Sequence, residues 1–135
     1  MHRLYLSIGS NLGNREKNIA EALRMINTEV GHVVKTSTVR ETEPWGYEST
    51  HRFLNAACAV DTTLTPEECL EATQDIERRL GRTQKTKDAT YHDRTIDIDL
   101  LTYDNININT PQLTLPHPRM QERDFVMIPL NEIIQ

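Results

Sequence analysis

Four segments of the chain carry the hydrophobic pattern of β-strands. Near the amino terminus Leu4, Leu6 and Ile8 alternate with less apolar residues, which predicts a strand with one buried face. Apolar and β-branched residues cluster again further along, and three more strands are expected at residues 32–42, 53–62 and 94–103. A small hairpin is expected at residues 105–115, and the proline-interrupted remainder is expected to be short helix and irregular chain.

Two helices are expected between these strands. The first runs from Asn14, a suitable cap, to Gly31, a suitable stop. The second has a strong start signal, because Thr65 can cap it and Glu68 completes a capping box around Pro66 at the first helical position. Its buried stripe is expected to consist of Cys69, Ala72, Ile76 and Leu80.

The order of these elements is β-α-β-β-α-β, which is the order of a ferredoxin-like α+β sandwich. The two helices are expected to pack on one face of an antiparallel sheet and to leave the other face open for loops and ligands. The chain of 135 residues is expected to form one domain, residues 1–135. Residues 82–93 are polar and without periodicity, which predicts a mobile loop. Because this fold hosts many functions, function must be argued from particular residues.

Composition narrows the class of function. The formal net charge of -5 argues against a surface built for nucleic-acid phosphates, and nothing in the sequence approaches a membrane span. Cys58 and Cys69 have no ligand-like spacing and fall in apolar patterns, as reduced packing residues do. We therefore expect a cytoplasmic monomer that acts on small molecules.

The last predicted strand contains two aspartates. Side chains alternate across a strand, so Ile96 and Ile98 point to one face while Asp97 and Asp99 point to the other. At roughly 3.3 Å per residue, the two aspartate Cα atoms lie about 6.6 Å apart. A Mg²⁺ ion accounts for such a pair, because it binds one or two carboxylates together with waters and substrate phosphates. The tripeptide alone fits two solvated acids on the polar face of a sheet equally well.

Cationic residues near the aspartates favour the metal interpretation. Arg94 precedes the pair, and the polar loop starts at Arg82 and contains Lys85 and Lys87. A cationic loop beside metal-binding carboxylates suits phosphoryl transfer, in which arginines offset the charge that develops on the phosphates. The sequence lacks a G-x-x-x-x-G-K-[ST] motif, so it is not that of a P-loop enzyme.

Motifs spread along nearly the whole chain resemble those of one enzyme family. The most specific is Arg-Thr-Ile-Asp-Ile-Asp-Leu at residues 94–100, followed by Leu-Pro-His at 115–117. Gly-Ser-Asn-Leu follows the first strand, and Phe-Leu-Asn-Ala-Ala begins the third. The chain resembles the 6-hydroxymethyl-7,8-dihydropterin pyrophosphokinases of folate biosynthesis. This resemblance implies transfer of the β,γ-diphosphate of ATP to the pterin hydroxymethyl group, with AMP as the other product and two Mg²⁺ ions as cofactors.

The resemblance also implies roles for the residues around the phosphates. Asp97 and Asp99 would hold both magnesium ions. Arg82 and Arg94 would lie along the transferring phosphates. The ATP pocket would be lined by Gln74, Glu77, Arg82, Tyr91, Arg94, Leu100, Thr114, His117 and Arg123.

A second group of residues would form the pterin pocket. By the same resemblance, Asn55 would hydrogen-bond the pterin, and Phe53 and Phe125 would sandwich its flat ring. Asn55 and Phe53 share a face of the predicted strand, which fits this role. The pocket would be completed by backbone groups around Thr42, Pro44 and Trp45.

Several of these residues also have simpler interpretations. Gln74 and Glu77, one helical turn apart near a helix end, fit a solvated face. His117 between two prolines fits an exposed histidine without a role, and Phe53 in an apolar strand fits a core residue.

The sequence departs from the usual family pattern at several places, two of them at residues expected near ATP, and it leaves two other functions open. Tyr91 is the aromatic residue near a position usually held by tryptophan, and Gln112 stands where an arginine often contacts ATP. One alternative is a non-catalytic module that binds a nucleotide or metal to regulate a partner, which needs the acid pair but not Asn55, Phe53 and Phe125. The other is a magnesium-dependent phosphotransferase with a different acceptor, against which the same three residues argue.

Overall fold

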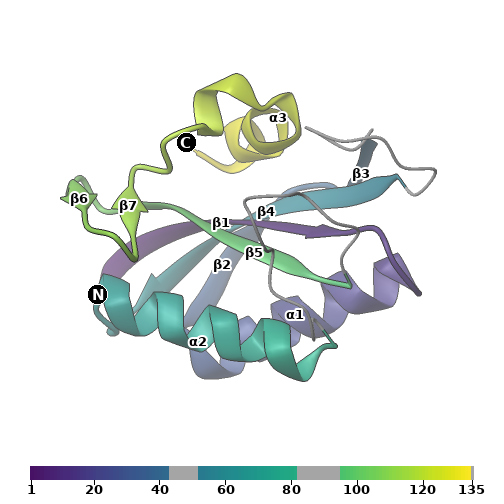
Figure 1. Cartoon of the computed structure of the whole chain (residues 1–135), viewed down its shortest axis with the longest axis horizontal. Coiled ribbons are helices and arrows are strands. Elements are labelled where there is room, and N and C mark those ends of the chain that lie inside the picture. Colours follow the sequence, from purple (N-terminus) through teal and green to yellow (C-terminus); the bar gives the residue numbers. More distant parts are fainter. Residues whose placement is uncertain (43–51, 82–94, 135) are drawn as a thin grey trace.

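The computed structural model describes residues 1–42, 52–81 and 95–134, which form an antiparallel sheet with helices on both faces (Figure 1). The strands of the main sheet are β1 (His2–Ser10), β2 (His32–Thr36), β3 (Arg40–Thr42), β4 (Phe53–Thr62) and β5 (Asp97–Tyr103). Their order is β2-β4-β1-β5, and β3 also pairs with β4. The ferredoxin-like α+β fold class expected from the sequence is confirmed.

The remaining elements are helices and a small hairpin. The helices are α1 (Arg15–Glu29), α2 (Pro66–Arg79), α3 (Asp124–Ile133) and the short 3₁₀ helix η1 (Met120–Glu122). The hairpin pairs β6 (Ile108–Asn109) with β7 (Thr114–Leu115), within the range expected for it. The loop expected at residues 82–93 lies outside the described residues. No helix in the described part of the chain is long and apolar enough to cross a membrane.

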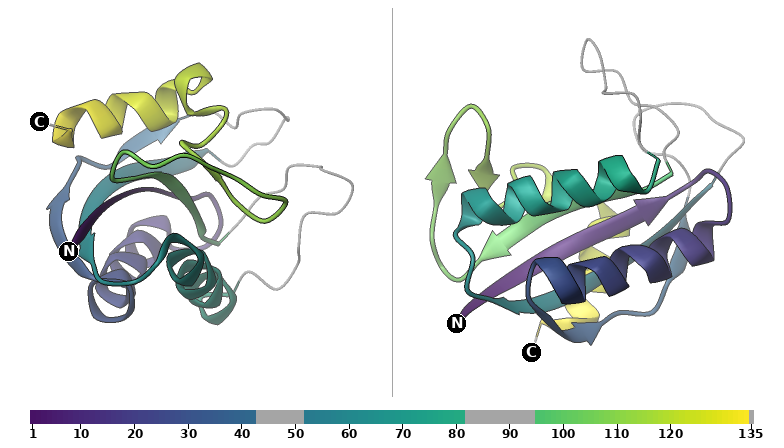
Figure 2. Two further views of the ribbon diagram at one scale, coloured as in Figure 1. Left: turned by 90° about the vertical axis from the view of Figure 1, so that its left-hand side faces the viewer. Right: turned by 90° about the horizontal axis from the view of Figure 1, so that it is seen from below.

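The central strand β1 carries the main core. Leu4, Leu6 and Ile8 are fully buried, as their alternation predicts. They pack on the face of the sheet covered by α1 and α2, which lie side by side below it (Figure 2). Ile26 of α1 and Ile76 of α2 belong to the same apolar cluster.

Both predicted helix starts are present. The Asn14 side chain accepts a hydrogen bond from the backbone N–H of Lys17 at 3.1 Å. At α2, the Thr65 hydroxyl accepts from the N–H of Glu68 at 3.1 Å, and the Glu68 carboxylate accepts from the N–H of Thr65 at 2.8 Å. These contacts satisfy backbone donors that a helix start otherwise leaves unpaired. Of the four residues expected in the buried stripe of α2, only Cys69 and Ile76 are buried. The helix also buries Thr73 and Glu77, which were not expected in the stripe.

The strand expected at residues 32–42 is divided into β2 and β3. Between them, the Ser37 hydroxyl accepts a hydrogen bond from the N–H of Ala57 at 2.8 Å, and the N–H of Ser37 donates to the carbonyl of Ala57 at 2.9 Å. A serine hydroxyl thus replaces a backbone carbonyl in the ladder. The next N–H, that of Thr38, donates to the carboxylate of Glu132 on α3 at 3.1 Å. The chain therefore leaves the regular ladder here, although its sequence is rich in β-branched residues.

The second face of the sheet is partly covered, so the expectation that it is left open is wrong. Helix α3 lies across this face, opposite α1 and α2 (Figures 1 and 2). Ile133 packs on the small side chains of Ala57 and Ala59 in β4. Nearer β5, Leu101 forms a second apolar cluster with Met120, Val126 and Leu130. Pro129 lies inside α3 and does not end it, because Val126 and Leu130 on either side are held in this cluster.

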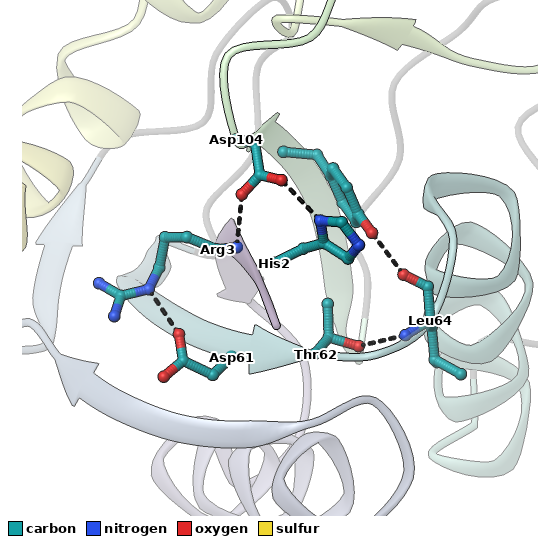
Figure 3. A network of polar contacts seen from close by, with 7 residues as sticks. His2, Arg3, Asp61, Thr62, Leu64 and Asp104 are labelled. Atoms are coloured by element: carbon teal, nitrogen blue, oxygen red, sulfur yellow. Dashed lines mark hydrogen bonds and ion pairs between the residues drawn. The ribbon is translucent and has the colours of Figure 1, made fainter.

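A polar network closes the end of the sheet where β1 begins and β5 ends (Figure 3). The Asp104 carboxylate accepts from the backbone N–H of Arg3 at 2.7 Å and lies 2.7 Å from Nδ1 of His2. Arg3 Nε donates to Asp61 at 2.8 Å, which joins this corner to β4. Asp104 has a φ of 49°, a left-handed conformation that aspartate tolerates better than most residues. The network fixes the strand ends opposite the site described next.

Candidate active site

The two aspartates of β5 lie on the face of the sheet that carries α3. Ile98 and Leu100 are buried on the face covered by α1 and α2, while Asp97 and Asp99 are partly exposed on the face that carries α3. Asp97 stands opposite Gly9 of β1, and Asp99 stands opposite Ser7. The alternation expected from the sequence is therefore present. It places both carboxylates on one side of an edge strand.

This donor set fits part of a magnesium site. Carboxylate oxygens are the hard ligands that Mg²⁺ prefers, and one or two of them suffice when substrate phosphates and waters supply the rest. Among the described residues there is no group of three or more His, Cys, Asp or Glu side chains that could hold a metal ion. A metal at Asp97 and Asp99 therefore depends on ligands other than these groups, as a site filled by a nucleotide would.

A row of residues crosses the sheet from Asp97 toward the predicted pterin pocket. Asp97 pairs with Gly9, and Gly9 pairs with Asn55 of β4 on its other side. With strands spaced about 4.8 Å apart, the Cα atoms of Asp97 and Asn55 are separated by roughly 10 Å. Residues directly opposite in an antiparallel sheet share a face, so Asn55 and Asp97 point to the same side.

Asn55 is buried and held by Thr42. Its Nδ2 donates to the Thr42 hydroxyl at 2.5 Å, and only 3% of the residue is exposed. Its Oδ1 lies over Gly9, where an added Cβ would approach it to 2.9 Å and the Phe53 ring to 3.4 Å. The missing side chain at Gly9 thus makes the space that Asn55 and Phe53 occupy. In the sequence Gly9 stands out only as the first residue of the Gly-Ser-Asn-Leu motif, and its position opposite Asn55 is known from the strand pairing.

Helix α3 and the segment before it supply the opposite wall. Phe125, in the first turn of α3, packs against the cluster around Leu101, and Arg123 Cζ lies 5.7 Å from the centre of its ring. Arg123 is itself buried. Phe53 therefore comes from the sheet and Phe125 from the helix that lies across the same face. The sandwich of a flat ring between them stays a prediction.

A cavity of about 250 Å³ opens beside the carboxylates, between α2, β5 and the hairpin segment. Three residues predicted to contact ATP line it: Leu100, Thr114 and His117. Asp99 lines it as well. The other lining residues are Leu70, Ile98, Pro111, Gln112, Leu113 and Pro118, and among them Gln112 stands where an arginine often contacts ATP in the family. One of the two aspartates thus borders the cavity directly.

Gln74 and Glu77 of α2 have different surroundings. Gln74 is exposed, which agrees with the interpretation that it lies on a solvated face of the helix. Glu77 is buried, and its Oε2 accepts from the backbone N–H of Ile98 at 2.7 Å. That N–H belongs to the residue between Asp97 and Asp99. Glu77 therefore supports the strand that carries both aspartates, and for this residue the solvated-face interpretation is wrong.

His117 is electrostatically linked to the site. Burial lowers the pKa of His117 below its usual value, and the positive charge of Arg123 lowers it further. Asp97 acts in the opposite direction, while Arg119 adds to the lowering. His117 Nδ1 accepts from the N–H of Arg119 at 3.3 Å, so the proton of the neutral ring resides on Nε2. The lowered pKa favours the neutral ring, which keeps one N–H donor.

Five residues with predicted roles lie outside the described residues: Pro44, Trp45, Arg82, Tyr91 and Arg94. Their roles stay predictions. Among the described residues, strand pairing links Asn55 through Gly9 to Asp97, and Asp99 borders the cavity.

The fold and these side chains together define a ferredoxin-like α+β domain whose edge strand carries a carboxylate pair, with Asp97 in one row with Gly9 and Asn55 and Asp99 beside an open cavity. A family model described as 7,8-dihydro-6-hydroxymethylpterin-pyrophosphokinase (HPPK) matches residues 5–135, and the chain belongs to this family. It is therefore a pyrophosphokinase of folate synthesis whose substrate is the hydroxymethyldihydropterin.

Individual relatives agree with this assignment. The chain is 50% identical over 131 residues to 2-amino-4-hydroxy-6-hydroxymethyldihydropteridine pyrophosphokinase of Porphyromonas gingivalis (strain ATCC 33277), covering 96% of this chain and 89% of that protein. It is 45% identical over 132 residues to the Bacillus subtilis protein of the same name, covering 97% of this chain and 77% of the other. A crystal structure of Plasmodium falciparum HPPK-DHPS wild type with pteroate aligns with a TM-score of 0.76 at 16% identity, covering 96% of this chain and 38% of that one. The last similarity concerns the fold alone.

Proposed function

We propose that the chain transfers the β,γ-diphosphate of ATP to the hydroxymethyl oxygen of 6-hydroxymethyl-7,8-dihydropterin, with magnesium held by Asp97 and Asp99. One observation carries this proposal. Asp99 borders the cavity proposed for ATP, while Asp97 stands in the row that contains Gly9 and Asn55. The carboxylate pair therefore lies between the two proposed substrate pockets, where a diphosphate has to pass from one to the other.

In the proposed reaction, the pterin hydroxymethyl oxygen attacks the β-phosphorus of ATP. The bond from this phosphorus to the oxygen shared with the α-phosphate breaks, AMP leaves, and the hydroxyl proton passes to solvent. Magnesium bound by the aspartates would neutralise phosphate charge and hold the phosphates. The protein's own part is positioning and electrostatic stabilisation, which account for most of the catalysis in phosphoryl transfer.

The pterin side of the proposal rests on Asn55. Because Nδ2 is engaged with Thr42, Oδ1 is the atom left to accept hydrogen bonds from the ring N–H groups of a pterin. Phe53 beside it offers an apolar face for stacking, and Phe125 would cover the other side of the ring. Pro44 and Trp45 are proposed, by family resemblance, to complete this pocket with backbone groups.

The nucleotide side rests on the cavity. Leu100 and Leu113 give it apolar walls, and Thr114 and His117 give it hydrogen-bonding groups. A neutral His117 with a proton on Nε2 can donate to an oxygen of the nucleotide without adding charge. Arg82 and Arg94 are proposed, by resemblance, to lie along the transferring phosphates, and Gln74, Glu77, Tyr91 and Arg123 to complete the ATP site.

We also propose that the chain acts as a cytoplasmic monomer, without a nucleic-acid or membrane partner. The support is its acidic net charge of -5, which disfavours polyanionic partners.

The aspartate assignment is tested by replacing each carboxylate with its amide. Asp97→Asn and Asp99→Asn should each lower turnover by at least about a hundredfold, the usual cost of removing a group that stabilises charge in the transition state. Binding of the pterin alone, measured by fluorescence titration, should stay within about twofold, because Asn55 and Phe53 are untouched. Asp75→Asn on the outer surface of α2 is the matched control and should retain full turnover. Near-normal turnover in either test variant would contradict the proposal.

A further inference from the structure

Arg15, the first residue of α1, connects two strand ends in the predicted pterin pocket. Its NH1 group donates to the backbone carbonyl of Arg52 at 2.8 Å. Its NH2 group lies 3.0 Å from Oε2 of Glu41. The side chain is only 27% exposed, although a lone arginine at a helix start is usually solvated. Two nitrogens of one guanidinium therefore hold groups from two different segments.

The two groups that Arg15 holds adjoin residues of the pocket. Glu41 directly precedes Thr42, the last residue of β3, and Arg52 directly precedes Phe53, the first residue of β4. Thr42 and Phe53 stand opposite each other in the sheet. Arg15 thus fixes the backbone on both sides of this pair, at the end of a three-residue strand that has few ladder hydrogen bonds of its own.

Thr42 holds the Asn55 side chain in place. Asn55 Nδ2 donates to the Thr42 hydroxyl at 2.5 Å, while Asn55 Oδ1 lies over Gly9. If Thr42 shifts, the amide loses this anchor and can move away from its position over Gly9. The pterin would then meet a displaced amide.

We propose that Arg15 is a positioning residue for the pterin: by holding Glu41 and the Arg52 carbonyl together, it fixes Thr42, Phe53 and the Asn55 amide for substrate binding. This inference rests on the proposed function. The planar guanidinium suits the task because its two terminal nitrogens reach two acceptors at once, whereas a lysine offers one nitrogen. The effect is expected on the pterin and not on ATP, because none of the described residues that line the cavity beside Asp99 belongs to these strand ends.

The test is steady-state kinetics on Arg15→Gln and Arg15→Lys, with both substrates varied. Arg15→Gln should raise the KM for the pterin by about threefold to tenfold, the range for losing a partly exposed charge-assisted contact, with kcat and the KM for ATP within twofold. Arg15→Lys should give an intermediate pterin KM. Glu41→Gln should also raise it, and adding Glu41→Gln to Arg15→Gln should cause little further change.

Arg24→Gln is the matched control, because Arg24 lies on the same helix and pairs with Glu21, three residues earlier, at 2.8 Å. It should leave both KM values unchanged. An unchanged pterin KM in Arg15→Gln, or equal rises in both KM values, would overturn the inference, even if the melting temperature falls. Asn55→Ala separates this failure from that of the proposed function. If Asn55→Ala loses pterin affinity while Arg15→Gln does not, only the inference fails; if neither loses it, the pterin pocket itself is wrongly assigned.

Discussion

Gly9 shapes the site by what it lacks. It stands between Asp97 and Asn55 in the row across the sheet, and its missing Cβ leaves room for Asn55 Oδ1 and the Phe53 ring. Its backbone is not in the left-handed region, so alanine is compatible with the local conformation. The constraint at this position is therefore space above the strand and not backbone freedom.

Replacing Gly9 with alanine tests whether this position requires space above the strand or backbone freedom. The new Cβ would lie 2.9 Å from Asn55 Oδ1, closer than such atoms approach, so the amide or the ring must move. We expect the KM for the pterin to rise at least about tenfold, as for the loss of one well-formed hydrogen bond, while the thermal melting temperature changes little. Steady-state kinetics and a thermal melt measure the two quantities. A normal pterin KM would show that Asn55 does not bind the pterin from this position.

At the scale of elements, β5 depends on a buried carboxylate from α2. Glu77 accepts from the N–H of Ile98, the residue between the two aspartates, at 2.7 Å. β5 is an edge strand, so this N–H has no further strand to pair with. The helix thereby supplies the hydrogen bond that a neighbouring strand would otherwise provide.

Glu77→Ala should lower the free energy of unfolding by about 1–3 kcal/mol, because it leaves a buried backbone N–H without its acceptor. Glu77→Gln, which keeps an acceptor oxygen, should cost less. Urea unfolding of both variants measures the difference, with the exposed Glu71→Ala on the same helix as control. Equal stability of Glu77→Ala and the unmodified protein would refute this account of β5.

The elements also show how far the sequence predicts this fold. Sequence patterns predicted the structure correctly where neighbouring residues alone determine it. Examples are the capping box at Thr65, the strand at 53–62, and the alternation that separates Asp97 and Asp99 from Ile98. The same patterns gave wrong predictions where contacts with a segment distant in the sequence determine the structure. The division of the second strand depends on Ser37 bonding Ala57 and on Glu132 from α3, and the covered second face depends on α3 packing over Ala57 and Ala59. The hydrophobic pattern of the second strand or of β4 does not indicate these contacts with distant residues.

The residues of the candidate site also differ in how far the sequence predicts them. The shared face of Asp97 and Asp99 was predictable from the alternation of side chains along a strand, whereas Asn55 was singled out by the family resemblance. The burial of Glu77 was not predictable, because helical spacing alone does not distinguish a solvated acid from one that meets a strand edge. Gly9 was quoted as a motif residue, but its effect emerges only once β1 is known to lie between β4 and β5.

At the scale of the whole molecule, several carboxylates and one histidine make the fold sensitive to acid. The N–H and hydroxyl of Thr38 lower the pKa of Glu132 below its usual 4.5, and the N–H of Arg3, with His2, lowers that of Asp104 below 3.8. Burial lowers the pKa of His117 below 6.5. Each group binds its proton more weakly when folded, so each contributes stability above its usual value and loses it as pH falls through the folded value.

We therefore expect the free energy of unfolding to decline slowly below about pH 6.5, where unfolded His117 begins to take up a proton, and more steeply below about pH 4.5. Urea titrations between pH 3 and pH 8 measure this profile. Glu132→Gln should flatten its acidic part, and the exposed Glu71→Gln should not. An identical acid slope in Glu132→Gln would show that the link from α3 to Thr38 does not depend on charge.

The molecule as a whole places its site at one end of the sheet and its structural polar network at the other (Figures 1 and 3). The end with Asp97, Gly9 and Asn55 is where β1 and β3 finish and where β4 and β5 start. Helix α3 lies across the face of the sheet that carries these residues (Figure 1). The proposed transfer between two bound substrates would need the acidic pair to lie between the two proposed pockets.

The central claim is diphosphate transfer from ATP with magnesium at Asp97 and Asp99, and product analysis tests it most directly. The purified protein is incubated with ATP, magnesium and 6-hydroxymethyl-7,8-dihydropterin, and the nucleotides and pterins are separated by chromatography. The account predicts that AMP and pterin diphosphate appear in equal amounts, and that both disappear when a chelator removes the metal or when Asp97→Asn replaces the protein. Formation of ADP in place of AMP, or product formation that persists without a divalent cation, would contradict it.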